Sequence, residues 1–248
     1  MNVIKMIIKP TVFILGAGAS SDYNFPTGRK LLEEIYSFLK NDKNITLIDN
    51  LYIYEKKYGD SITNKIIEFR EKLDCADSID DLLDQLSQKN EIYSIIGKLC
   101  IAIILTQCED INNLKPQKNE DRWEFKKGWY DYLWRQLYKD TKILKDITNN
   151  HVSIITFNYE RSLEQYLFTK AIGLYGESEN EVGNVLSKIP IYHVYGKLGR
   201  LKWQESNNGL ITNDYKPIPT NSQIIDDESG QMIKGADYLN KICKISNG

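Results

Sequence analysis

The chain has 248 residues, which is enough for one large domain or for one domain with a sizeable insertion. Its hydrophobic content of 42% is ordinary for a globular protein, and its formal charge of −2 gives no basic excess of the kind that marks nucleic-acid binding. No run of the sequence approaches the ~18 consecutive apolar residues of a membrane span. The composition therefore favours a globular protein that binds neither a membrane nor nucleic acid directly.

The cysteines and the first residues indicate the compartment. No Cys-x-x-Cys pair occurs among the four cysteines, which are Cys75, Cys100, Cys108 and Cys243. The opening segment 1–9 is too short for a signal peptide and lacks a small-residue cleavage site. We therefore expect a cytoplasmic protein with reduced thiols, without a disulfide framework and without a zinc site.

The first predicted element is a buried strand over 12–15, which runs directly into the sequence Gly-Ala-Gly-Ala-Ser at 16–20. Glycines at a strand-to-helix turn let the backbone approach a ligand closely, and the N–H groups of the following helix attract a phosphate. The segment is thus interpreted as a nucleotide-binding turn. A packing turn is the alternative, because a single Gly-x-Gly after a strand is a weak signal.

The middle of the chain is predicted to be helical. Apolar spacing indicates a helix over 27–39 and an almost wholly helical stretch from about 44 to 149. Within that stretch we expect helices over 62–73, over 78–87 with Ser78 as N-cap, and over 92–108. The segment 123–147 carries aromatic residues at helical spacing, which fits a buried stripe better than a surface for stacking nucleic-acid bases.

Strand character returns in the last hundred residues. We expect a strand over 152–157, a helix over about 162–171 and a second short strand over 189–194. Segments 198–204 and 210–212 flank a turn and are expected to form a hairpin, and 217–230 is expected to be a loop. Strands at both ends with helices between them predict an α/β nucleotide-binding core from 1–40 and 148–248, interrupted by an all-helical insertion over 41–147.

Two polar residues follow the later strands. Asn158 comes just after the strand 152–157, and His193 lies near the end of 189–194. Ligands of open α/β sheets bind outside the carboxyl ends of the strands, so both are candidate site residues. In isolation an Asn at this place is more often a turn or helix cap, and a single histidine is more often structural. Gly196 and Gly199 favour a tight loop in which the imidazole can face a cleft.

The chain has one other histidine, His151, which precedes the strand 152–157 and so lies at its opposite end from Asn158. Six strand residues at ~3.3 Å each separate His151 from the expected pocket by roughly 20 Å. We therefore expect His193, and not His151, to be the functional histidine.

These motifs occur in the order that is typical of the sirtuin superfamily. The glycine turn is followed by Asn24-Phe25-Pro26-x-Gly28, then Thr156-x-Asn158-Tyr159-Glu160, then His193-x-x-Gly196. The chain resembles the sirtuin-like domains of bacterial antiphage defence systems more than it resembles protein deacylases. Three features support the closer resemblance to the defence-type domains. They are Phe157-Asn158-Tyr159-Glu160, the aromatic-rich helical insertion and the Ser-Ile-Asp-Asp-Leu-Leu stretch at 78–83. The resemblance covers about residues 11–200 and depends on the combination of motifs.

The resemblance implies a Rossmann-like parallel sheet of the sirtuin type with a large all-helical insertion. It implies an NAD+ glycohydrolase that cleaves NAD to nicotinamide and ADP-ribose as the NAD-depleting effector of a defence system. NAD is then the substrate, no metal is needed, and the expected partner is a second copy of the chain or another protein of the system.

The resemblance also assigns roles to residues. Asn158 and His193 are the expected catalytic residues. The side chain of Asn158 offers a donor and an acceptor to orient water or ribose hydroxyls, and His193, with an ordinary pKa of about 6.5, can accept a proton. For Glu160 two alternatives are open. It orients groups or stabilises charge in the site, or it faces outward on a helix. The residues expected to bind NAD are Gly16, Ala17, Gly18, Ala19, Ser20, Pro26, Phe157, Glu160 and Gly196.

Two departures from the family leave a second function open. The zinc-ribbon cysteines of the deacylases are missing, which argues against deacylation of lysine, and no strand with a Gly-x-Ser turn closes the site near the end of the chain. The core is therefore expected to be incomplete at its C-terminal end. A sensor that binds NAD or ADP-ribose without cleaving it, and controls a partner, is the main alternative. A dehydrogenase is disfavoured because Ser21 stands where the dinucleotide fingerprint has its third glycine.

Overall fold

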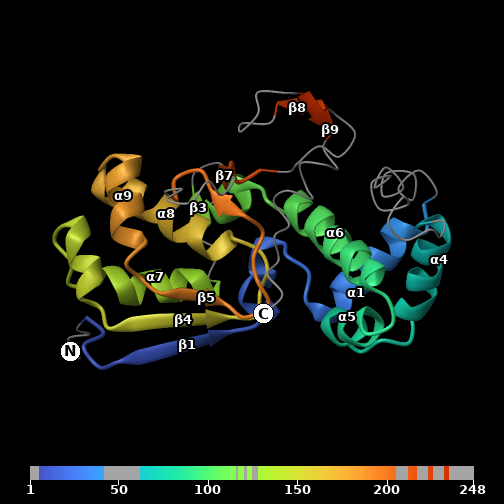
Figure 1. Ribbon diagram of the computed structural model, residues 1–248. Helices are drawn as coiled ribbons and strands as arrows, with labels where there is room; N and C mark the ends of the chain where they lie inside the picture. The colour runs from blue at the N-terminus through green and yellow to red at the C-terminus, as the bar shows by residue number, and fades with distance from the viewer. Residues whose placement is uncertain are drawn as a thin grey trace. The chain divides into compact units, whose positions relative to one another are not determined.

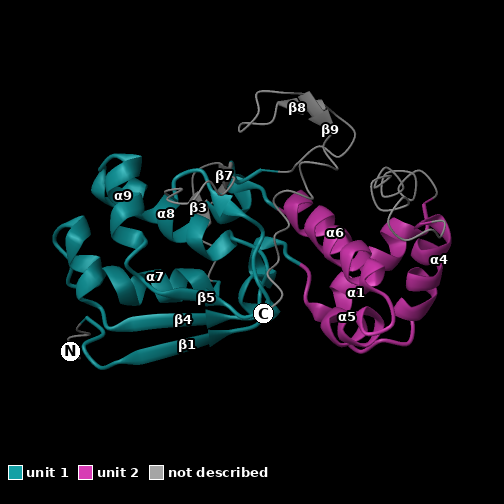
Figure 2. Ribbon diagram, in the orientation of Figure 1, with its two compact units in different colours: residues 1–25, 109–216, 246–248 teal, residues 26–108, 217–245 magenta. Residues whose placement is uncertain are grey.

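The computed structural model describes residues 6–41, 62–115, 117–119, 122–124, 128–204, 212–216, 223–225 and 232–234. Over these residues the protein is a mixed α/β structure with a three-stranded parallel sheet and many helices (Figure 1). The predicted α/β class is confirmed at that level. The chain divides into two compact units, residues 1–25, 109–216 and 246–248 in unit 1 and residues 26–108 and 217–245 in unit 2 (Figure 2).

The sheet of unit 1 joins segments that are far apart in the sequence. Its strands, in spatial order, are β1 (Thr11–Leu15), β4 (Val152–Thr156) and β5 (Ile191–His193). Both pairings are parallel, and Leu15, Thr156 and His193 lie level with one another at the ends of the three strands. The three carboxyl ends therefore meet at one edge of the sheet, as the sequence predicts.

Helices pack on one face of this sheet. They are α7 (Trp129–Tyr138), α8 (Ser162–Tyr175), α9 (Glu179–Leu186) and the short 3-10 helix η4 (Leu144–Asn149) (Figure 1). Burial alternates along β4, where Val152, Ile154 and Thr156 are buried. On the opposite face Val12 is 57% exposed and Ile14 is 67% exposed. Among the described residues, the helices thus cover this part of the sheet from one side.

Unit 2 is helical over its larger described segments. Its helices are α1 (Gly28–Leu39), α4 (Ile62–Leu73), α5 (Ile79–Ser87) and α6 (Glu91–Gln107). The apolar face of α1 buries Leu31, Leu32, Ile35 and Leu39, the positions that the 3.6-residue period selects. The backbone N–H of Asp81 donates to Ser78 Oγ at 3.1 Å, so the predicted N-cap of α5 is confirmed.

The boundaries of the two units differ from the domain boundaries that the sequence predicts. Helix α1 packs against α4, α5 and α6, so it falls in unit 2 and not in the core segment 1–40. Helix α7 packs against α8 and η4, so it falls in unit 1. The reason for the second difference is aromatic packing: the Tyr130 ring stacks on Tyr23 at 4.5 Å and lies 5.6 Å from the ring of Tyr166.

Three expectations about local structure are wrong, and one helix is missed. The almost wholly helical stretch expected from about 44 to 149 is interrupted, because β3 (Arg122–Glu124) pairs with β2 (Gln117–Asn119) and α7 ends before Asp140, which has a positive φ of 63°. The hairpin is absent, because β6 (Arg200–Leu201) pairs with β7 (Thr212–Asn213) in parallel. The expected loop 217–230 contains β8 (Gln223–Ile225), which pairs with β9 (Met232–Lys234). Helix α9 was not expected at all.

Two helical glycines of unit 1 provide a matched test of the packing. A Cβ on Gly183 of α9 would lie 2.7 Å from the backbone oxygen of Trp203, whereas a Cβ on Gly173 of α8 would meet no atom within 4 Å. We expect Gly183→Ala to lower the free energy of unfolding by about 1–3 kcal/mol through overpacking. Gly173→Ala is expected to raise it by about 0.5–1 kcal/mol, because alanine is the better helix former. Chemical denaturation of both variants checks this, and equal effects would contradict the packing described.

Candidate active site

The structure brings together residues from the ends of all three strands of the sheet. Asn158 Nδ2 donates a hydrogen bond to Ser20 Oγ at 3.3 Å, which connects the segment after β4 to the segment after β1. The ring atom His193 Nδ1 lies 2.7 Å from the backbone oxygen of Asn158, which connects it to β5. A continuous chain of contacts therefore runs from Ser20 through Asn158 to His193. His151 lies before β4, at the other end of that strand.

The glycine turn differs from the expectation in one respect. Two 3-10 turns, η1 (Ala17–Ala19) and η2 (Ser21–Tyr23), follow Gly16, and no α-helix begins until Gly28. Amide groups of the turn bond within it, since Ala19 N donates to the oxygen of Gly16 at 2.9 Å. The expectation that an α-helix starts at the turn and directs its N–H groups at a phosphate is therefore wrong.

The two glycines of the turn are nevertheless informative. Neither Gly16 nor Gly18 has a positive φ, and a Cβ on either would meet no atom within 4 Å. Neither backbone strain nor close packing inside the protein therefore requires glycine at these positions. Both residues are exposed, so the missing side chains leave the surface of the turn open to a ligand. Nothing in this geometry supports the alternative of a packing turn.

Asn158 is held in one orientation by its neighbours. Its backbone N–H donates to Thr156 Oγ1 at 3.1 Å, and its side-chain Nδ2 donates to Glu160 Oε1 at 3.1 Å as well as to Ser20. The residue is buried, and its Oδ1 has no hydrogen-bond partner among the described residues. The carboxamide thus keeps one acceptor for a ligand. Asn158 does not cap α8, because the N-cap residue of that helix is Arg161.

Glu160 is buried and does not face outward, so the alternative of an exposed helix position is wrong. Its Oε2 accepts a hydrogen bond from the backbone N–H of Ser162 at 2.6 Å, in the first turn of α8. Its Oε1 accepts from Asn158 and, at 3.4 Å, from the hydroxyl of Tyr130. Burial raises the pKa of Glu160, and the bonds from Ser162 oppose that rise.

His193 lies between two acceptors. Its Nδ1 faces the backbone oxygen of Asn158, and its Nε2 lies 2.9 Å from Glu164 Oε1. Neither partner can donate when Glu164 is ionised, so both contacts are satisfied together only when the ring carries a proton on each nitrogen. Burial lowers the pKa of His193, but the charge and hydrogen bond of Glu164 outweigh it, and the pKa is raised. In this arrangement the ring is an imidazolium without a free lone pair.

Glu164 is a site residue that the sequence analysis missed. It lies in the first turn of α8, is 4% exposed, and is 3.6 Å from Lys197 Nζ as well as bonded to His193. Burial raises its pKa, but His193 and then Lys197 outweigh that effect and lower the pKa to about 2. Its signal in the sequence is weak, since a Glu in an amphipathic-looking helix usually belongs to a solvated face.

A buried ion pair adjoins these residues and was also missed. The guanidinium of Arg161 binds the carboxylate of Glu109 with both arms, with Nε 2.9 Å from Oε1, and both side chains are almost wholly buried. The same guanidinium donates to the backbone oxygens of Arg200 at 3.1 Å and of Asp214 at 3.5 Å. Arg161 therefore connects the start of α8 to Glu109 and to the backbone at residues 200 and 214.

The other predicted residues lie as follows. Ala17 and Ala19 are half-buried in η1. Phe157 is exposed, with its ring 5.8 Å from that of Tyr195. Gly196 has a φ of 86° and its N–H donates to the oxygen of His193, so it forms the tight turn that was expected after β5. Pro26 is buried and is the first residue of unit 2.

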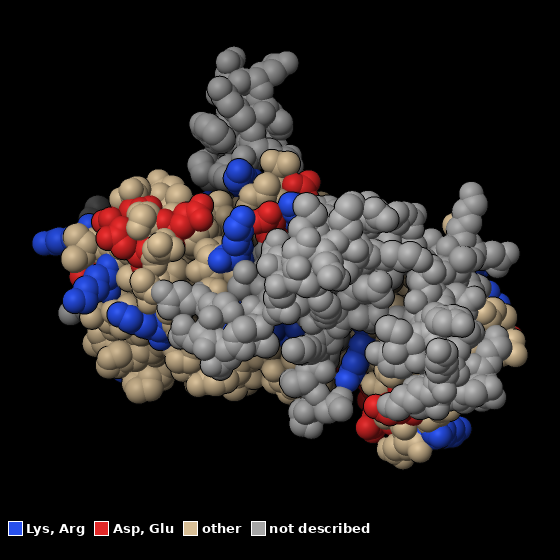
Figure 3. All heavy atoms as spheres, turned by 45° about the horizontal axis from the view of Figure 1, so that its top comes forward, with Lys and Arg blue, Asp and Glu red and all other residues tan. Residues whose placement is uncertain are grey.

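Comparisons with known proteins give no family for this chain. No protein-family model, no curated protein and no solved structure matches it. Among the described residues, no helix is long and apolar enough to cross a membrane, and no three His, Cys, Asp or Glu side chains are grouped as metal ligands would be. Basic and acidic side chains of the described residues are interspersed on the face drawn in Figure 3.

The His193–Glu164 pair predicts a pH dependence of stability. The lowered pKa of Glu164 contributes stability that is present above about pH 4.5 and is lost as the pH falls toward about 2. The raised pKa of His193 contributes stability that is full below about pH 6.5 and is lost as the pH rises through the folded pKa. We expect His193→Gln to lower the free energy of unfolding by about 3 kcal/mol between those limits, and by less outside them.

Urea denaturation at several pH values measures the free energy of unfolding of the wild type and of His193→Gln. The matched control is His151→Gln, because His151 is exposed and lies outside the pair. A destabilisation by His193→Gln that does not vary with pH would contradict the charged pair.

Proposed function

We propose that the protein is a sirtuin-like NAD+ glycohydrolase, which cleaves NAD to nicotinamide and ADP-ribose, and that its parallel sheet is a Rossmann-like core of the sirtuin type. The observation that carries the proposal is the chain of contacts from Ser20 through Asn158 to His193 at the carboxyl ends of three parallel strands. This is where α/β sheets bind their ligands. The motif order from 16 to 196 supports NAD as that ligand.

The chemistry of the site suits this reaction. Cleavage of the nicotinamide–ribose bond develops positive charge on the ribose, as in other glycosidic cleavages. Nicotinamide leaves as a neutral molecule with the electron pair of the bond, water adds to the ribose carbon, and one proton is released. The Asn158 Oδ1, which has no hydrogen-bond partner among the described residues, can accept a hydrogen bond from that water. The buried Glu160 accepts a hydrogen bond from the same carboxamide and so polarises it.

His193 has a positioning role in this proposal. As an imidazolium it donates to the backbone oxygen of Asn158 and so fixes the peptide that carries the carboxamide. It can act as a general base only after it has given up a proton, because both ring nitrogens face acceptors. This differs from the simpler expectation that the neutral ring accepts a proton directly.

The biological role belongs to the same proposal. The Phe157–Glu160 motif and the aromatic-rich middle of the chain support an NAD-depleting effector of an antiphage defence system, which works as a homo-oligomer or with a partner protein. The net charge of −2 and the interspersed surface charges favour a protein partner over nucleic acid.

A sensor that binds NAD or ADP-ribose without cleaving it is the second candidate. The observation in its favour is that His193 is occupied at both nitrogens, which leaves no base ready at the site. In that case the same residues hold the nucleotide, and its binding is transmitted to a partner.

Asn158 and the two histidines test catalysis. We expect Asn158→Ala and His193→Ala to abolish NAD cleavage by the full, active assembly, and His151→Ala to retain it. Release of nicotinamide measures cleavage, and circular dichroism confirms folding. Because His193→Ala leaves Glu164 unpaired, Asn158→Ala is the more decisive variant. If the wild-type assembly binds NAD but leaves it intact, the sensor is correct; if it does neither, both functions are excluded.

Two neighbouring serines give a matched test of the turn. Ser20 Oγ accepts from Asn158, whereas Ser21 Oγ is exposed and donates to the backbone oxygen of Gly18 at 2.9 Å. We expect Ser20→Ala to lower kcat for NAD cleavage by about tenfold, because the carboxamide loses one of its orienting bonds. Ser21→Ala is expected to leave kcat within about twofold. Steady-state kinetics of both variants measure the difference, and equal effects would remove Ser20 from the proposed site.

A further inference from the structure

Tyr130 lies in the first turn of α7, within the segment that the sequence assigns to the helical insertion, yet its hydroxyl contacts the candidate site. The side chain is 1% exposed, and its ring stacks on Tyr23 at 4.5 Å and lies 5.6 Å from the ring of Tyr166. Aromatic packing therefore holds the ring whether or not the hydroxyl is present. Burial, and then the charge of Glu160, raise the pKa of Tyr130 well above its usual range, so the hydroxyl keeps its proton.

The hydroxyl of Tyr130 meets two oxygens of the segment 160–162. It lies 2.8 Å from Ser162 Oγ and 3.4 Å from Glu160 Oε1. The hydroxyl of Ser162 also bonds to the carboxyl group of Glu160, which can only accept when it is ionised. Because Ser162 gives its single hydroxyl proton to Glu160, the proton in the 2.8 Å contact comes from Tyr130. The donors therefore run in one direction, from Tyr130 through Ser162 to Glu160.

Glu160 connects these donors to Asn158. Its Oε2 accepts from the backbone N–H of Ser162 at 2.6 Å, and its Oε1 accepts from Asn158 Nδ2 at 3.1 Å. Donors thus fix both oxygens of the carboxylate, and the carboxamide bonded to it is fixed as well. The direction of Asn158 Oδ1 therefore depends on the position of Glu160. We call these four residues, Tyr130, Ser162, Glu160 and Asn158, the Tyr130 network.

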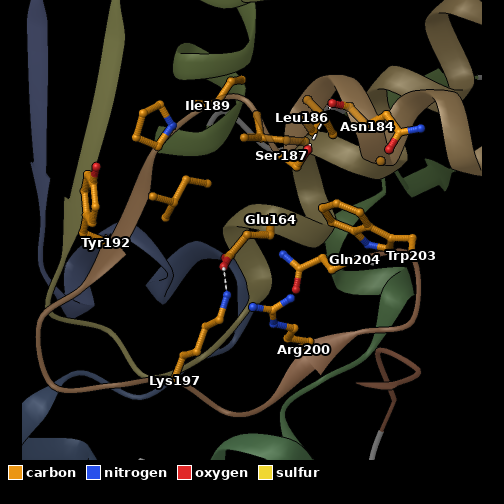
Figure 4. A pocket seen from close by; sticks show the side chains of 14 residues that line it. Glu164, Asn184, Leu186, Ser187, Ile189, Tyr192, Lys197, Arg200, Trp203 and Gln204 are labelled. Atoms are coloured by element: carbon orange, nitrogen blue, oxygen red, sulfur yellow. Dashed lines mark hydrogen bonds and ion pairs between the residues drawn. The ribbon is translucent and has the colours of Figure 1, made fainter. Parts of the chain in front are cut away.

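The Tyr130 network is distinct from the charged pair that Glu164 forms. Glu164 and Lys197, which a dashed line joins in Figure 4, line a cavity of about 400 Å³. No residue of the Tyr130 network lines that cavity. Removal of the Tyr130 hydroxyl therefore acts on the candidate site through Ser162 and Glu160, and leaves the contact between Glu164 and Lys197 in place.

We propose that Tyr130 is a positioning residue of the candidate site: through Ser162 and Glu160, its hydroxyl sets the direction in which Asn158 Oδ1 meets the ligand. The inference rests on the proposed function, because it takes Asn158 as the residue that orients the attacking water. It adds a residue of α7 to the machinery of the site. Since Tyr130 acts on the reacting geometry and touches no substrate, its loss is expected to change kcat and to leave KM nearly unchanged.

Tyr130→Phe removes the hydroxyl and keeps the ring. We expect kcat for NAD cleavage to fall about tenfold, with KM unchanged within about twofold, because the carboxamide loses its fixed orientation. Ser162→Ala interrupts the same network, so the double variant is expected to lose no more than about twofold beyond the weaker of the two single variants. The matched control is Tyr166→Phe, because the Tyr166 hydroxyl lies in the same aromatic cluster but faces Asp131 at 3.4 Å. It is expected to keep kcat within about twofold.

A measurement that needs no turnover tests the hydrogen bonds themselves. The side-chain NH₂ group of Asn158 gives a pair of signals in a proton–nitrogen correlation spectrum, and their loss in Asn158→Ala identifies them. We expect these signals to shift in Tyr130→Phe and in Ser162→Ala, because both variants change the environment of their acceptor, Glu160. In Tyr166→Phe they are expected to stay in place. Circular dichroism checks the folding of each variant, and Ser162→Ala serves alone if Tyr130→Phe does not fold.

The two measurements separate a failure of this inference from a failure of the proposed function. If the wild type cleaves NAD but Tyr130→Phe keeps full kcat, or Tyr166→Phe loses as much, Tyr130 has no positioning role. A loss of kcat without a shift of the Asn158 signals also contradicts that role. If the wild type leaves NAD intact, NAD hydrolysis is wrong and the spectra decide alone: a shift in Tyr130→Phe supports the network, and unchanged signals overturn it.

Discussion

The arrangement of unit 1 depends on the guanidinium of Arg161. It is buried with Glu109 as its bidentate partner, and it also binds the backbone of residues 200 and 214. Arg161 stands directly after Glu160 and directly before α8, so whatever fixes Arg161 also fixes the site residues on both sides of it. Removal of one member of such a pair costs about 3–5 kcal/mol, because the other charge stays buried. The candidate site is thus anchored by a buried ion pair.

A second constraint is the concentration of charge at the start of α8. Glu160, Arg161 and Glu164 are all buried within five residues, and each has a specific partner. Such a network is stable only when every member is satisfied, which makes its geometry well defined. The exception is Glu164 Oε2. Among the described residues, this is the one oxygen of the three side chains that is buried without a hydrogen-bond partner.

Much of the fold could be predicted from local patterns. The three strands of the sheet and the helices α4, α5 and α6 follow from apolar runs and from 3.6-residue spacing, and the end of β4 places Asn158 at the edge of the sheet. Long-range facts could not be predicted. Glu109 and Glu164 look like solvated charges until α8 is known to be buried along its first half, and the parallel pairing of β6 with β7 depends on tertiary context. Of the described aromatics at 123–147, Tyr130 and Trp134 are buried but Tyr132 is exposed, and their spacing does not predict that α7 begins only at Trp129.

The distance along the chain between β1 and β4 has a consequence for synthesis on the ribosome. About 140 residues separate Leu15 from Val152, and no other described strand pairs with β1. At ~5–20 residues per second, β1 is made roughly 7–30 s before its partner exists. During that time Val12, Phe13 and Ile14 have no sheet to join, while the helices of 62–107 need only local contacts to form. The helices α1, α4, α5 and α6 can therefore form while β1 still has no partner strand, and during that time β1 is open to chaperones or to misassembly.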